Sequence, residues 1–374
     1  MVVYLCLCSV GPGSVGVGSV GFGSVGFGSV GFGSVGLGSV GAGSVGFGSV
    51  GPSVGFGSVG PSVGSWGFVL SVGFVESWGL VLSVEGSVAS MLGKLLKFGR
   101  DDRRVLIMAG MSSVFAGLFG TPLTATLFTM EFSSVGTIFS PALLPCYLAA
   151  FTASRLSLVM GVHPEGIMLT EPVTFTATTN FHVLILAIAV GLLGIGMCFL
   201  LHEAEHLAAK KLPNPWLRIF LGGCVIAVLT LLVGDHRYNG AGMDMALGAV
   251  EGNANWYDFL MKLLFTAVTL AAGFKGGEIV PTFCIGATFG CTLAGLLGLD
   301  PGIGAALGLI GLFCCVTNSP IAAIILSVEM FGSTNLYLFA FVCVIAFVIS
   351  GNWGLYASQI IQFSKARLVA KERK

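Results

Sequence analysis

The amino-acid sequence predicts an all-α, polytopic membrane protein with re-entrant, broken helices and two related halves, behind a low-complexity leader. Three observations support this prediction. The 374 residues are 55% hydrophobic and only 9% charged, with a mean hydropathy of +0.96, whereas a soluble domain carries about 25% charged residues. Apolar runs of near-membrane length recur along the chain. One segment of the first half also matches a segment of the second half.

The leader, residues 1–85, repeats Ser-Val-Gly-x-Gly from Ser9 to about Gly64 and has no charged residue before Glu76. Glycine at about two of every five positions makes ordering the backbone costly, and the small side chains cannot build a packed core. We therefore expect a disordered segment, although an uncharged repeat rich in Val and Phe is also compatible with β-aggregation. The membrane domain then covers residues 86–374.

Apolar runs fill this second part of the chain. About 20 apolar residues cross a bilayer as a helix, and several runs reach that length. Others are shorter or broken by Gly and Pro, which is typical of re-entrant or discontinuous helices that are buried or line a cavity. The runs are residues 105–130, 137–161, 181–201, 216–234, 259–273, 282–299, 303–317 and 335–350.

Charge and cysteine content exclude other classes of protein. The formal net charge is zero and no basic face stands out, so no nucleic-acid partner is indicated. A basic cluster, Lys365 to Lys374, predicts a cytoplasmic C-terminus by the positive-inside rule. Most of the ten cysteines lie in apolar runs, where they behave as small hydrophobic residues and do not form a disulfide framework.

Two segments match at an offset of 198 residues. They are VFAGLFGTPLTATLFTMEF (114–132) and LFCCVTNSPIAAIILSVEM (312–330). Each has a hydroxyl residue directly before a proline, Thr121-Pro122 and Ser319-Pro320, and each ends an apolar stretch at a glutamate. We expect a helix to begin at each proline with the hydroxyl as its N-cap. Related halves of this kind place a binding site at their interface, but the pattern leaves open whether they are parallel or inverted.

The stretch AGFKGGEIVPTFCIGATFG, residues 272–290, contains the candidate ion site. Gly276-Gly277 permits a sharp turn, and Pro281 suits the first turn of the following helix. The amides between them lack intrahelical acceptors, and a helix N-terminus carries about half a positive charge, so they can hold an anion inside the membrane. An ordinary loop between two spans is the open alternative. The anion-binding candidates here are Gly277, Glu278, Ile279 and Val280.

These motifs together carry a family resemblance. GGEIVP resembles the third filter motif of CLC chloride channels and transporters, and the two matching segments resemble that family's half-repeat helices. GNWGLYASQIIQFSKAR (351–367) resembles its last helix, which opens with the tyrosine that contacts the central anion. The resemblance runs from about Gly86 to Arg367. It implies halide transport, with the Glu278 and Ile279 amides and the Tyr356 phenol as ligands, and a homodimer without enzymatic activity or organic cofactor.

Glutamate at position 278 resembles the fluoride-exporting branch of the family, whereas Val280 stands where that branch would have threonine. A carboxylate inside a membrane is costly and usually functional, so Glu278 is a candidate for gating or proton coupling. Pairing of Glu278 with Lys275 at a solvated mouth is the alternative. Chloride against fluoride, and channel against exchanger, stay open.

The first half departs from the family pattern. The earlier filter loop and the Gly-x-Glu-Gly-Pro loop with the gating glutamate are missing from the sequence, and Glu85-Gly86 is the one candidate remnant. Phe132 follows Glu131 where proton-coupled exchangers often have a second glutamate, which argues against coupled exchange. A non-functional, truncated CLC chain is therefore a second interpretation.

A third interpretation comes from His202-Glu203-Ala204-Glu205-His206, which fits the H-E-x-x-H pattern of zinc proteases. An apolar run precedes it, as in intramembrane metalloproteases. No third ligand segment is evident, and neighbouring Lys210 and Lys211 suggest the solvated end of a long helix. We expect no metal site there.

Overall fold

The computed structural model describes most of the predicted membrane domain. The described residues are 97–132, 134–161, 176–274, 276–356 and 359–361, with Met91, Leu95, Leu169 and Val173. All of them belong to one compact unit, residues 77–374. The predicted leader, with Glu85, lies outside the described residues.

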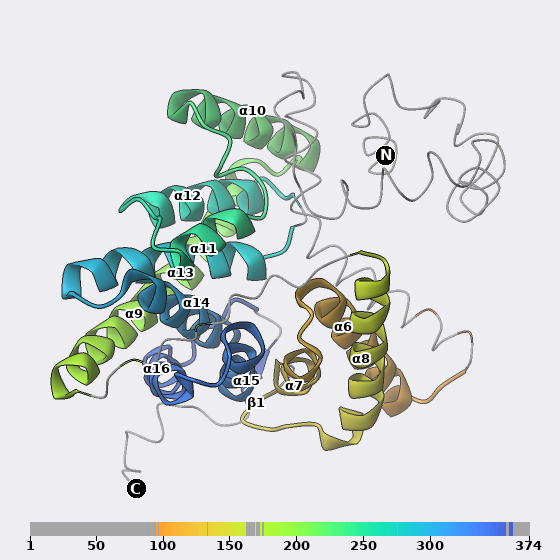
Figure 1. The fold of residues 1–374 in the computed structure, drawn as a ribbon. Coiled ribbons are helices and arrows are strands. Elements are labelled where there is room, and N and C mark those ends of the chain that lie inside the picture. Colours follow the sequence, from red (N-terminus) through yellow and green to blue (C-terminus); the bar gives the residue numbers. More distant parts are fainter. Residues whose placement is uncertain are drawn as a thin grey trace, which may run out of the picture. The chain divides into compact units, whose positions relative to one another are not determined.

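The described part is almost entirely helical, so the all-α prediction is confirmed (Figure 1). The helices are α6 (Arg100–Phe119), α7 (Pro122–Phe132), η2 (Ser140–Ala142), α8 (Leu143–Val159), α9 (Ala177–Lys211), α10 (Pro215–Val233), α11 (Met243–Val250), α12 (Asp258–Ala271), α13 (Ile279–Leu297), α14 (Pro301–Thr317), α15 (Pro320–Phe331) and α16 (Leu336–Ile349). Two short strands, β1 (Ser134–Val135) and β2 (Ile360–Ile361), pair in parallel.

Every predicted apolar run has become helix, but two details differ. Run 105–130 is broken at Gly120, where a left-handed residue (φ 68°) ends α6 before α7 begins at Pro122. The last helix, which the resemblance opens at Tyr356, is wrong for residues 359–361, because Ile360–Ile361 form strand β2 and pair with β1. Residues 357, 358 and those from 362 onward lie outside the described residues.

Four helices are long and apolar enough to cross a bilayer: Ser140–Val159, Ala177–Lys211, Pro215–Val233 and Ile279–Leu297. Three further apolar helices, α14, α15 and α16, are shorter. The long peripheral helices expose large apolar side chains, as a surface facing lipid requires. Examples are Leu144 on α8 and Leu231 on α10, which are 67% and 80% exposed.

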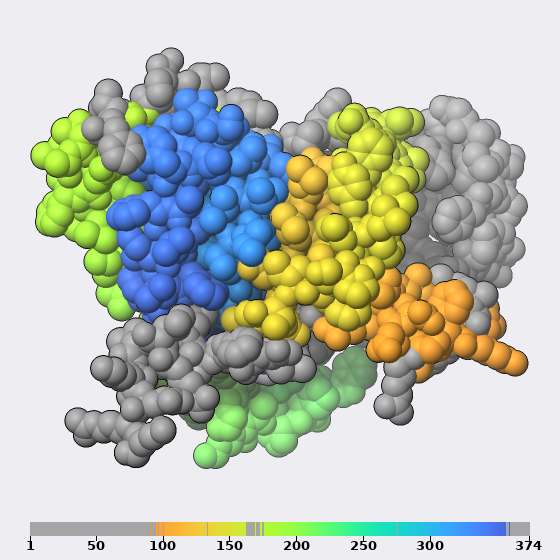
Figure 2. All heavy atoms as spheres, turned by 90° about the horizontal axis from the view of Figure 1, so that it is seen from below, coloured from red at the N-terminus to blue at the C-terminus, as the bar shows by residue number. Residues whose placement is uncertain are grey.

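The helices form two groups. Helix α6 packs on α7 and α8, whereas α9 packs on α12, α13, α14 and α16. Helix α7 joins the groups by packing on α15, and the space-filling view shows the yellow first-half helices directly beside the blue last helices (Figure 2). The closest association is between α13 and α14, where glycines of both helices meet.

The α7–α15 contact reveals how the halves are related. The Glu329 carboxylate of α15 accepts hydrogen bonds from the Leu123 and Thr124 amides of α7 at 3.0 and 2.8 Å. The Glu131 carboxylate of α7 accepts from the two matching amides of α15 at 3.3 and 2.9 Å. Since each C-terminal glutamate lies at the other helix's N-terminus, the two helices run antiparallel. The repeat is therefore inverted, which the sequence left open.

The predicted hydroxyl N-caps of these helices are wrong. Thr121 Oγ1 is buried with no hydrogen-bond partner among the described residues, and the Ser319 hydroxyl donates to the Thr317 carbonyl at 3.3 Å. A carboxylate accepts from two amides at once and carries a full negative charge, so it stabilises a helix N-terminus better than a hydroxyl.

Replacing either glutamate by glutamine is expected to lower the free energy of unfolding in mild detergent by about 1.5–3 kcal/mol, since charge-assisted hydrogen bonds are lost. Denaturant unfolding of Glu131→Gln and Glu329→Gln would measure this. Glu251→Gln, at an exposed position, is the matched control and should change stability by less than about 0.5 kcal/mol. If the loss of unfolding free energy equals that of the control, the glutamates do not stabilise the contact between α7 and α15.

Candidate anion-binding site

The amino end of α13 lies where the sequence predicted an anion cradle. The preceding connection turns at Gly273, with φ of 90°, three residues before the predicted Gly276-Gly277 pair. Helix α13 begins at Ile279, so Pro281 stands in its first turn as predicted.

The first amides of α13 have no acceptor within the described part of the chain. Hydrogen bonding begins one turn in, where the Thr282 amide and hydroxyl donate to the Glu278 carbonyl at 3.1 and 2.7 Å. The amides of Glu278, Ile279 and Val280 donate to no described carbonyl or side chain. Amides at the positive end of a helix for which no described group is an acceptor form an anion-binding arrangement.

Tyr356 is held by a polar strap that joins both halves. The Leu355 amide donates to the Val316 carbonyl of α14 at 2.8 Å. The Gln359 side-chain amide donates to the Thr317 carbonyl at 2.7 Å and to the Phe132 carbonyl of α7 at 3.1 Å. These bonds tie the segment to the carboxyl ends of α14 and α7.

The Tyr356 ring packs edge-on against Phe132, with ring centroids 4.7 Å apart. The residue that replaces the second glutamate of exchangers therefore supports the tyrosine. The Glu278 carboxylate lies close enough for its charge to act on the Tyr356 phenol, and also on Cys198 of α9. The structure thus brings the predicted residues Glu278 and Tyr356 into one neighbourhood, bounded by α9 and by the end of α7.

A cluster of phenylalanines links this neighbourhood to the inverted repeat. Phe283 of α13 lies 5.4 Å from Phe119 and 5.3 Å from Phe313, centroid to centroid. Phe128 of α7 lies 5.5 Å from Phe313. Offset and edge-on ring contacts of this kind add to apolar burial, so the first turns of α13 are fixed against both halves.

Two further sequence interpretations concern this region. His202 and His206 lie near the end of α9, and among the described residues no third His, Cys, Asp or Glu joins them in a metal-binding arrangement. Lys275, the proposed partner of Glu278, lies outside the described residues.

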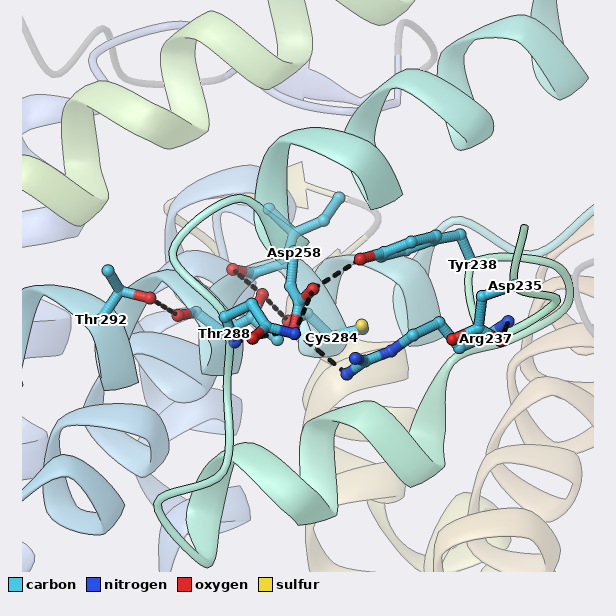
Figure 3. A network of polar contacts seen from close by, with 9 residues as sticks. Asp235, Arg237, Tyr238, Asp258, Cys284, Thr288 and Thr292 are labelled. Carbon is cyan, nitrogen blue, oxygen red and sulfur yellow. Dashed lines mark hydrogen bonds and ion pairs between the residues drawn. The ribbon is translucent and has the colours of Figure 1, made fainter. Parts of the chain in front are cut away.

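A buried charge network that was not predicted from the sequence lies behind α13 (Figure 3). The Asp258 carboxylate, fully buried at the start of α12, accepts from the Tyr238 hydroxyl at 2.6 Å and from Arg237 Nη2 at 3.1 Å. The Asn255 amide donates to it at 2.9 Å. An aspartate at the edge of an apolar run after a His-Arg-Tyr loop was the available signal.

Lys262 extends this network along α12. Its side chain is 1% exposed, and its Nζ donates to the carbonyls of Tyr238 and Gly240. A Cβ at Gly242 would lie 3.2 Å from Lys262 Nζ and 3.1 Å from Cys284 Sγ of α13. The network therefore anchors the α10–α11 connection against the second turn of the helix that bears the amides.

A family model for the voltage gated chloride channel matches residues 40–351. The chain belongs to this family. The match begins inside the predicted leader. The CLC-type fold predicted from the sequence is therefore confirmed. Members of this family are channels or antiporters.

Individual CLC relatives agree. The chloride/fluoride channel protein of Pseudomonas syringae pv. tomato is 34% identical over 293 residues, which cover 77% of this chain and 65% of that relative. The crystal structure of a CLC-type fluoride/proton antiporter has a TM-score of 0.74 and 32% identity, and it covers 79% of this chain and 77% of that one. A slow cyanobacterial Cl⁻/H⁺ antiporter, at 22% identity and a TM-score of 0.62, shares the fold. The chain spans less than two thirds of the length of the Pseudomonas syringae relative.

Proposed function

We propose that the chain carries a small halide, chloride or fluoride, across the cell membrane through the site at the amino end of α13. One observation carries this proposal: the amides of Glu278, Ile279 and Val280 have no described acceptor, inside an apolar helical assembly and near Tyr356. Backbone amides and a phenol donate hydrogen bonds, which an anion accepts and a cation does not, so these groups favour an anion. The names of the relatives, which mention chloride and fluoride, support the same class of ion.

Glu278 gives the site a means of coupling. An ionised carboxylate beside the amides repels a halide, whereas a protonated one does not, so anion occupancy and protonation of Glu278 are linked. We propose Glu278 as the gating or coupling residue. Among CLC proteins a homodimer with one pathway per subunit is the expected assembly, and no enzymatic activity is proposed.

The test is halide efflux from liposomes that contain the purified protein, measured with fluoride and chloride electrodes. Tyr356→Phe should raise the half-saturating halide concentration by roughly tenfold, because one hydrogen bond to a charged ligand is lost. Tyr356→Ala should reduce the flux itself. Tyr147→Phe on α8 is the matched control and should leave both unchanged. Glu278→Gln should abolish the dependence of flux on pH.

Two results would contradict this function. Flux that carries potassium in place of halide would exclude an anion pathway, and halide flux insensitive to Tyr356→Ala would place the pathway elsewhere. Complete absence of flux would favour the second candidate, a CLC chain that does not transport.

A further inference from the structure

Arg218, near the start of α10, has an unusual environment for a guanidinium group. Its Nε atom is shielded from solvent and has no hydrogen-bond partner among the described residues. The one ion pair recorded in the described part of the chain joins Arg237 to Asp258, so no described carboxylate pairs with Arg218. A shielded arginine nitrogen without an acceptor costs free energy, and such a site is stabilised when an anion supplies the missing acceptor.

The guanidinium lies on the connection that leads to the amide cradle. A Cβ placed on Gly273 would stand 3.0 Å from Arg218 Nη2 and 3.3 Å from its Nε, so only glycine leaves room for the group. Five residues separate Gly273 from Glu278, which limits their separation to about 18 Å. The guanidinium of Arg218 therefore lies beside the same connection, no more than five residues along the chain from the cradle.

Helix α10 is fixed against this connection by two glycines. A Cβ on Gly222 would lie 2.1 Å from the Ala272 Cβ, and one on Gly223 would lie 4.0 Å from the Phe274 ring. The backbones therefore approach closely, and Phe274 fills the space one turn beyond Arg218. This packing holds the guanidinium in place, although α10 otherwise contacts mainly α12.

The end of α9 belongs to the same region. The Glu205 carboxylate, in the last turns of α9, is close enough for its charge to act on Glu278. Helix α9 ends at Lys211 and α10 begins at Pro215, so the start of α10 follows directly.

We propose that Arg218 and the backbone at Gly273 form a second, peripheral halide site that feeds the amide cradle at Ile279. This inference rests on the proposed function. A fixed positive charge in a low-dielectric protein raises the local halide concentration, so Arg218 lowers the concentration needed to fill the cradle. A purely structural role is the competing explanation, because the guanidinium also meets the negative carboxyl end of α12.

Halide binding to the protein in mild detergent separates the two roles without requiring transport. The readout is the rise in the thermal unfolding midpoint as sodium fluoride or sodium chloride replaces sodium gluconate at constant ionic strength. Arg218→Gln should raise the half-saturating halide concentration roughly three- to tenfold. Arg218→Lys keeps the positive charge and should leave that concentration close to the wild-type value. Arg155→Gln, which removes an exposed arginine of α8, is the matched control and should not shift it.

The outcomes are distinct. If Arg218→Gln lowers the unfolding midpoint equally at every halide concentration without changing half-saturation, Arg218 only stabilises α12 and the inference is overturned. If the wild-type protein binds halide, and half-saturation is shifted by Tyr356→Phe but not by Arg218→Gln, the cradle stands and the peripheral site fails. If the wild-type midpoint does not respond to halide at all, both the cradle and the peripheral site are overturned.

Discussion

Asp258→Asn is expected to lower the free energy of unfolding in mild detergent by about 3 kcal/mol, the largest loss we predict from a single charge. The aspartate is fully buried and accepts from Tyr238 and Arg237. Asparagine leaves the Arg237 charge without its partner, and removing one member of a buried pair costs about 3–5 kcal/mol. Because the Arg237 side chain is 34% exposed, the lower end of that range applies.

Denaturant unfolding with a matched control measures this effect. Asp244→Asn removes an exposed carboxylate from the first turn of α11 and should cost less than about 0.5–1 kcal/mol. Combining Asp258→Asn with Arg237→Gln should recover part of the loss, since no unpaired charge then remains. If the double variant is as unstable as the sum of the single variants, the loss does not come from an uncompensated Arg237.

Gly290→Ala is expected to destabilise the α13–α14 pair strongly. Gly286 and Gly290 on α13 face Gly304 and Gly308 on α14, at the small-xxx-small spacing of close helix pairs. A Cβ on Gly290 would stand 2.1 Å from the Gly304 carbonyl oxygen, which belongs to rigid backbone. The helices must separate, at a cost of about 1–3 kcal/mol or more.

The matched control, Gly295→Ala, is expected to change stability in the opposite direction. Gly295 lies on the same helix, and a Cβ there would meet no atom within 4 Å. Gly295→Ala should therefore stabilise the protein by about 0.5–1 kcal/mol, because alanine loses less backbone entropy in a helix. Thermal unfolding midpoints of the two variants test the prediction. A Gly290→Ala protein as stable as wild type would show that α13 and α14 do not depend on this close approach.

The sequence alone determined the class of protein and most helix positions, since apolar length and period are local properties. Prolines placed the starts of α7 and α15 correctly, because a proline fixes its own backbone. The Gly-Gly and Pro281 pattern also placed the start of α13. The candidate amides of Glu278 and Ile279 followed from the Gly-Gly and Pro281 spacing, whereas Tyr356 was identified as a ligand only by the motif resemblance.

Only the tertiary structure decided how those elements pair. The caps of α7 and α15 come from Glu329 and Glu131, some 200 residues away in sequence, so no local pattern distinguishes them from the hydroxyls that precede the prolines. Partners such as Gln359 with Phe132 likewise depend on which backbone groups lie free after the helices pack. Composition and spacing are properties of the sequence itself, whereas a long-range hydrogen bond forms only when folding brings its donor and acceptor together.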